Sequence, residues 1–92
     1  MRKLIIDTTQ FLAASRTLKT DEIGALASIM INAFDITGRG DVSDDDLILS
    51  RLAGVSPARW SRMAPFVRDI FRPIDGRLSF RHLLAKSQKV RS

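Results

Sequence analysis

The sequence of 92 residues predicts a mainly helical fold with one small β-hairpin. Three stretches, at about 20–36, 43–53 and 57–71, repeat apolar residues at the spacing of a helix face. Between the last two lies Gly54-Val55-Ser56-Pro57, which is typical of a sharp turn that opens a new helix. After them, Asp75-Gly76 joins two short alternating segments, a pattern typical of a hairpin. Two helices joined by a tight turn and followed by a hairpin indicate a winged helix-turn-helix.

The length is that of one compact domain, which we place at residues 18–86. The N-terminal segment 1–17 shows no sustained period, so a short strand at Leu4–Ile6 and a helical turn near Phe11–Ala14 both stay open. The basic segment 87–92 is expected to be a flexible tail. The sequence therefore predicts one folded unit with two less defined ends.

The first long helix is expected from Thr20, as its cap, to about Ile36, with Asp21 and Glu22 in its first turn, where the helix dipole favours acids. Apolar residues surround nearly all of it, because Ile29, Ile31 and Ile36 lie off the main apolar stripe. Such a helix is either central in the core or covered by a partner. A homodimer through the helix from Asp21 to Ile36 is therefore an open alternative.

A loop with one short extended piece within Arg39–Val42, able to pair with the hairpin, precedes the second helix. We expect that helix to begin at Ser43, with Asp46 as its capping-box partner. The run of acids here, Asp44 to Asp46, is explained by dipole and cap stabilisation rather than by a metal. The buried face is expected to comprise Leu47, Ile48, Leu49, Leu52 and Ala53.

The third helix opens at Pro57, after Ser56 as its cap, and carries the expected recognition surface. Its core side consists of residues at helical spacing: Trp60, Met63, Ala64, Val67 and Phe71. Pro65 is expected to kink or divide this helix, because proline lacks an N–H donor and clashes with the preceding turn. The residues expected in a DNA groove are small or basic: Ser56, Ala58, Arg59, Ser61 and Arg62.

Charge agrees with a nucleic-acid partner, since the net charge is +5 and most basic residues are arginines. They concentrate after position 50, where the acids are Asp69 and Asp75 alone. Three of them, Arg72, Arg77 and Arg81, would lie on the wing near the phosphate backbone. Double-stranded DNA is therefore the expected partner.

The residue content argues against several other classes of protein. There is no cysteine, His82 is the only histidine, and no nucleophile triad, phosphate-binding glycine loop or metal cluster is visible. We therefore expect no catalysis, no cofactor and no metal. The N-terminus lacks an export signal, and the longest uncharged run, Ile23–Phe34, is too short to span a bilayer. A cytoplasmic protein with no membrane partner is expected.

Four segments occur in the order typical of one family: Leu18–Ala25, Gly40–Asp45, Leu52–Pro57 with Trp60 and Pro65, and Phe71 with Asp75–Leu78. Through them the chain resembles the YdaU-like domain of phage and prophage proteins, over about residues 10–85. That domain is of unknown function and often begins putative replication proteins. The resemblance implies a winged helix and, through it, DNA binding in replication or transcription.

A weaker resemblance, to EF-hand pairs, rests on Phe34–Leu47 and Asp75–Phe80, whose Gly40 and Gly76 lie 36 positions apart. Calcium needs oxygen donors that neither loop supplies, since Arg39 occupies a ligand position in the first loop. This resemblance implies a metal-free binding module. Because a fold does not fix a function, the winged-helix scaffold also leaves an alternative function open. It is a protein-interaction module, such as a phage inhibitor of a host defence or replication complex, whose partner is a host or phage protein.

Overall fold

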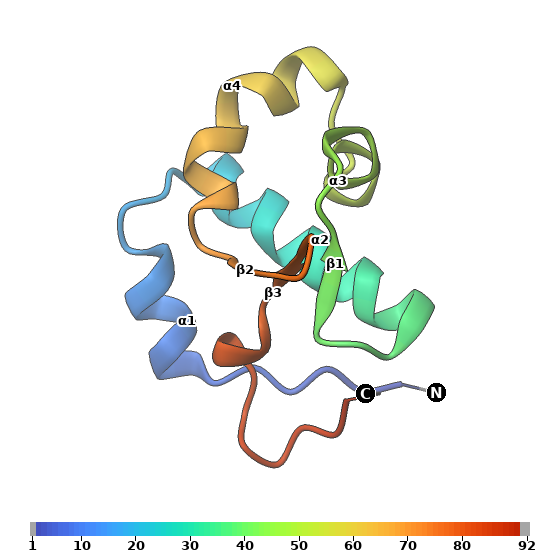
Figure 1. Ribbon diagram of the computed structural model, residues 1–92. Helices are drawn as coiled ribbons and strands as arrows, with labels where there is room; N and C mark the ends of the chain where they lie inside the picture. Colours follow the sequence, from blue (N-terminus) through green and yellow to red (C-terminus); the bar gives the residue numbers. More distant parts are fainter. Residues whose placement is uncertain (1, 91–92) are drawn as a thin grey trace.

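The structure, a computed structural model, describes residues 2–90. Within them the chain forms four α-helices, a three-stranded antiparallel sheet and a final 3-10 turn (Figure 1). Their bounds are α1 Thr8–Ser15, α2 Thr20–Thr37, β1 Asp41–Ser43, α3 Asp46–Ala53, α4 Pro57–Arg68, β2 Arg72–Ile74, β3 Arg77–Ser79 and η1 Arg81–Leu83. The mainly helical fold with a small hairpin is therefore confirmed.

Helix α2 crosses the middle of the molecule, and α3, α4 and β1 pack against it (Figure 1). Its buried apolar residues are Ala25, Leu26, Ile29, Met30, Ala33 and Phe34. The cap differs from the expected one, because the backbone N–H of Lys19 donates to Glu22 Oε1 at 2.8 Å and Thr20 is already helical. Of the residues off the main stripe, Ile29 is buried, whereas Ile31 and Ile36 are 52% and 66% exposed. Most of the apolar surface of α2 is thus used inside this chain.

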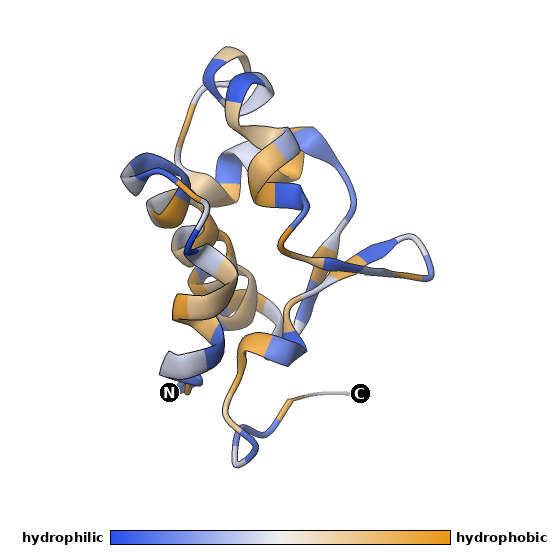
Figure 2. Ribbon diagram, turned by 90° about the vertical axis from the view of Figure 1, so that its left-hand side faces the viewer, coloured by the Kyte–Doolittle hydropathy of each residue, from blue (hydrophilic) through white to orange (hydrophobic). Residues whose placement is uncertain are grey.

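The sheet has the strand order β1-β3-β2, with every pair antiparallel. Asp75 and Gly76 both have positive φ, 50° and 75°, as a two-residue hairpin turn between right-twisted strands requires. Val42 and Leu78 lie opposite each other and are buried, which attaches the sheet to the core. Figure 2 shows the hairpin projecting from the helices with hydrophilic residues at its tip. The hairpin and its pairing with an extended piece are confirmed, although that piece is Asp41–Ser43.

Helix α3 corrects two sequence predictions. Its cap is Asp45, whose Oδ1 accepts from the N–H groups of Leu47 at 2.9 Å and Ile48 at 3.2 Å, so Ser43 does not begin the helix. Leu47 and Ile48 are 53% and 41% exposed, contrary to the expected buried face. An eight-residue helix turns only one stripe inward, here Leu49 and Ala53 at four-residue spacing, and its first-turn neighbours point elsewhere.

Of the two structures that the sequence left open for the N-terminal segment, the helix is present as α1, Thr8–Ser15, whereas Leu4–Ile6 forms no strand and contributes only an isolated bridge. Ile6 pairs with Leu84 in an antiparallel bridge, and Asp7 then caps α1 by accepting from the N–H of Gln10 at 3.0 Å. Helix α1 packs against η1. The expected tail also lies against the domain as far as it is described, because Gln88 accepts from the N–H of Ile5 and Val90 packs on the core. Residues 91–92 of that tail lie outside the described residues.

Crossing a bilayer takes a helix that is both long and apolar, and none of the helices within residues 2–90 is of that kind.

Candidate nucleic-acid interface

The turn between α3 and α4 is built by the residues around Gly54. Gly54 has φ 74°, and its N–H donates to Arg51 O at 3.1 Å while the N–H of Val55 donates to Ser50 O at 3.1 Å. This pair of bonds closes α3 in a Schellman motif, which favours glycine. Ser56 then caps α4 by accepting from the N–H of Arg59 at 3.2 Å. The local geometry that the sequence predicted for this turn is present.

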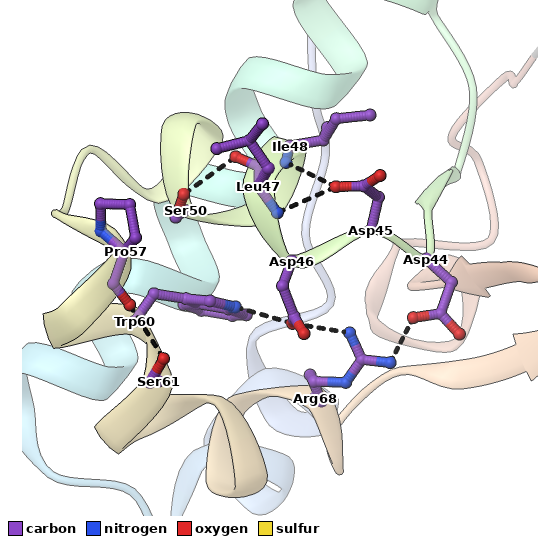
Figure 3. A network of polar contacts seen from close by, with 10 residues as sticks. All are labelled: Asp44, Asp45, Asp46, Leu47, Ile48, Ser50, Pro57, Trp60, Ser61 and Arg68. Carbon is purple, nitrogen blue, oxygen red and sulfur yellow. Dashed lines mark hydrogen bonds and ion pairs between the residues drawn. The ribbon is translucent and has the colours of Figure 1, made fainter.

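Two side chains of α4 converge on the start of α3 (Figure 3). The indole N–H of Trp60 donates to Asp46 Oδ1 at 2.9 Å, and Arg68 donates to the same oxygen at 3.1 Å. The other end of the Arg68 guanidinium forms an ion pair with Asp44. Besides stabilising the helix start, these acids therefore hold α4 against α3. This role could not be predicted from the sequence, because the partners lie 14 to 24 positions apart.

The first half of α4 presents the expected DNA contacts together on one exposed surface. All five are exposed: Ser56, Ala58, Arg59, Ser61 and Arg62. Ser61 donates its hydroxyl to Pro57 O at 3.0 Å, which leaves its oxygen available as an acceptor. Within residues 2–90, neither Arg59 nor Arg62 has a carboxylate at ion-pair distance. Both guanidinium groups therefore retain their full charge for an anionic partner.

The second half of α4 is less suited to DNA. Pro65 lies inside the helix without dividing it, since α4 runs unbroken from Pro57 to Arg68, and its ribbon changes direction along its length (Figure 1). Arg68 forms ion pairs with Asp44 and Asp46, and Asp69 at the end of the helix is exposed. The basic surface is accordingly confined to the first two turns.

The three expected wing arginines lie in different environments. Arg72 is exposed on β2, whereas Arg77 on β3 donates through Nε to Asp41 Oδ1 at 2.8 Å. Arg39 approaches the same carboxylate oxygen at 3.5 Å, so one acid faces two arginines. Arg81 lies beyond the hairpin in η1, with its stem so close to Gly40 that an added Cβ there would be 2.5 Å from Arg81 Cγ. The hairpin itself thus carries two of the three expected wing arginines, Arg72 and Arg77.

His82 connects the two ends of the hairpin segment. Its Nε2 lies 3.0 Å from the carbonyl oxygen of Ile70, just before β2. Burial, followed by the nearby Arg72 guanidinium, lowers the pKa of His82, while the hydrogen bond to Ile70 acts in the opposite direction. The imidazole of His82 is therefore neutral, and it holds the hairpin segment to η1. Nowhere in residues 2–90 do three or more histidine or acidic side chains gather as a metal site would need.

No protein-family model matches this chain, and no curated protein or solved structure matches it significantly. Function is therefore inferred from the shape and charge of the surfaces described above.

Proposed function

We propose that this protein is a winged helix-turn-helix protein of the YdaU-like phage and prophage type that binds double-stranded DNA. The order helix, strand, helix, helix, strand, strand from α2 to β3 supports this arrangement, as does the strand order β1-β3-β2. In it α4 is the recognition helix and the β2–β3 hairpin is the wing. The observation that carries the proposal is the exposed first half of α4, where Arg59 and Arg62 form no ion pair with any carboxylate of residues 2–90.

The proposed contacts divide by chemistry. Arg59 and Arg62 reach guanine edges or phosphates, since a guanidinium donates two parallel hydrogen bonds to either. The small residues Ser56, Ala58 and Ser61 let the helix backbone approach the floor of the groove. Three further arginines contact phosphates beside the groove: Arg72, Arg77 and Arg81. Since phosphate contacts dominate, affinity falls steeply as salt rises.

The test is fluorescence anisotropy with a labelled duplex between about 50 mM and about 200 mM salt. The parent protein is expected to bind, and Arg59→Ala with Arg62→Ala is expected to weaken binding about a hundredfold, at ~1 to 3 kcal/mol per arginine contact. The matched control is Lys3→Ala with Lys89→Ala, which also removes two positive charges from exposed residues. Both lysines line one pocket with Phe34 and Gly38. In Figure 1 the first and last described segments of the chain lie at the bottom of the molecule, whereas α4 lies at the top.

Circular dichroism establishes that both double variants keep the helical fold. If the parent binds no duplex even at the lowest salt, DNA binding is wrong. An equal loss of duplex affinity in the α4 variant and the lysine control would indicate general electrostatic attraction to DNA. It would contradict the assignment of α4 as the recognition helix.

A second function, protein interaction on the same scaffold, is favoured by an apolar groove between α2, β1 and α3. Ile36, Ile48 and Leu52 line it, and the first two are exposed. A host or phage protein that inserts apolar side chains there is the corresponding partner. Size-exclusion chromatography with mass measurement distinguishes a homodimer through α2 from a monomer, and recovery of one stoichiometric partner in a pull-down supports the interaction role.

A further inference from the structure

A cleft of about 290 Å³ lies between the start of α2 and the side of α4. Its basic lining residues are Lys19, just before α2, and Arg59 and Arg62 of α4. Phe66 and Met63 of α4 and two acids of α2, Asp21 and Glu22, line the rest. Figure 1 shows the beginning of α2 beside the lower part of α4. Its volume lies just below the roughly 300 Å³ at the low end for small-molecule pockets, so it has room for one small group such as a single base.

Phe66 is the unusual member of this cleft. Its side chain is 56% exposed, whereas Trp60 on the same helix is 2% exposed. Arg59, Arg62 and Phe66 follow one another at three- and four-residue spacing, so they form one stripe along α4. The ring of Phe66, which the core leaves uncovered, follows two guanidinium groups that have no ion-pair partner within residues 2–90. Together they offer a stacking face and phosphate contacts.

The acids of the cleft are engaged in starting α2. Glu22 is 6% exposed and accepts from the N–H of Lys19 at 2.8 Å. Asp21 is exposed and accepts from the N–H of Glu22 at 3.0 Å. Against these two negative charges stand the three positive charges of Lys19, Arg59 and Arg62. The basic groups therefore outnumber the acids, and the acids face the helix backbone.

We propose that this cleft binds single-stranded nucleic acid, with one unpaired base stacked on Phe66 and the flanking phosphates on Lys19, Arg59 and Arg62. In a duplex the faces of each base are covered by its neighbours, so an aromatic side chain on the protein surface stacks only on an unpaired or terminal base. The proposal rests on the proposed function in so far as the two arginines serve both. It extends the ligand class from duplex DNA to DNA that is locally unpaired.

The test compares a labelled oligothymidine with a labelled duplex in anisotropy titrations of the parent and of Phe66→Leu. Leucine keeps an exposed apolar side chain but removes the stacking face. We expect Phe66→Leu to weaken oligothymidine binding about fivefold to a hundredfold, as stacking of one base implies, and to leave duplex affinity within about twofold. Phe66→Trp restores binding, and Leu12→Ala, at a 65% exposed apolar residue of α1, leaves it unchanged.

The outcomes separate the two proposals. If the parent binds both ligands and Phe66→Leu binds oligothymidine as well as the parent does, the stacking site is wrong and duplex binding stands. If the parent binds oligothymidine through Phe66 but no duplex, the stacking site stands and the proposed function is overturned. If the parent binds neither nucleic acid, both are wrong.

Discussion

The arginines of α4 and those of the sheet differ in what neutralises them. In the first half of α4, Arg59 and Arg62 have no carboxylate partner among residues 2–90. At the sheet, Arg77 of β3 and Arg39, in the loop before β1, face the single carboxylate of Asp41, which is mostly buried at 16% side-chain exposure. Arginines that carry the same charge therefore differ in how strongly they attract an anionic ligand.

The contrast extends along α4 itself. Arg68, two turns after Arg59 and Arg62, is held by Asp44 and Asp46 and joins α4 to α3. One end of the helix therefore uses its guanidinium for assembly of the fold, and the other leaves its guanidinium groups to solvent. This division indicates which arginine substitutions should affect binding and which should affect stability.

The largest expected effect comes from Trp60→Ala, which tests whether the exposed surface of α4 depends on the α3–α4 contact. The variant loses a 2% exposed indole and its bond to Asp46, and a cavity of this kind costs about 3 to 5 kcal/mol. Urea unfolding followed by circular dichroism measures the loss. Trp60→Phe, which keeps most of the bulk but not the N–H donor, is expected to cost less than half as much. Equal losses would mean that the hydrogen bond outweighs the packing.

A direct comparison of the two arginine sets is Arg62→Ala against Arg77→Ala in duplex binding. We expect Arg62→Ala to weaken binding about tenfold, at ~1 to 3 kcal/mol for a contact of this kind, and Arg77→Ala to weaken it less, because Asp41 already neutralises part of its charge. Anisotropy titrations at several salt concentrations give both affinities and both salt slopes. A larger loss for Arg77→Ala would reverse the comparison and place the sheet at the centre of the interface.

Asp41→Asn tests the same comparison by removing the carboxylate instead of an arginine. Removing this carboxylate releases the charge of Arg77 and Arg39 toward an anionic ligand, so duplex affinity is expected to rise a few-fold. The dependence of log affinity on log salt should become steeper by at most about one unit, as one added phosphate contact implies. Asp45→Asn is the matched control, since it removes one acid from the start of α3 and keeps a capping side chain. An equal rise in both variants would indicate net charge alone.

Arg68→Ala tests the arginine that serves assembly. The ion pairs are partly exposed, with 31% exposure for Arg68, 33% for Asp44 and 68% for Asp46, so solvent screens them. We expect a loss of about 1 kcal/mol or less in the free energy of unfolding, decreasing as salt is added. Urea unfolding at low and high salt measures it. A salt-independent loss would assign the effect to packing of the arginine stem.

The local features of the fold follow from residues close together in the sequence. Gly54, Ser56 and Pro57 make their turn through contacts within five positions, and Asp75-Gly76 does the same for the hairpin. The core side of α4 follows equally from helical spacing. These features were therefore predictable without any knowledge of the tertiary structure.

Features that depend on contacts between elements distant in the sequence could not be predicted from the sequence. The bond from Trp60 to Asp46 and the sharing of Asp41 depend on packing between helices and on strand register. The same holds for the exposure of Leu47 and Ile48, because a short helix buries only the stripe that its neighbours cover. The exposure of the five residues at the start of α4 could be expected from helical spacing, whereas the cleft with Lys19 depends on the position of α2.

The smallest expected effect is the pH dependence that His82 gives to stability. Its pKa in the folded protein lies below the ordinary value of 6.5, so the unfolded chain binds more protons between the two values. The stabilising contribution of neutral His82 is therefore complete above about pH 6.5 and is progressively lost as the pH falls toward the folded value. Urea unfolding from pH 8 to pH 5, compared between the parent and His82→Gln, isolates this contribution, because glutamine can donate to Ile70 O but does not titrate. A parent that gains stability relative to the variant on acidification would show that protonated His82 is favoured, and that Arg72 does not oppose its charge in the folded protein.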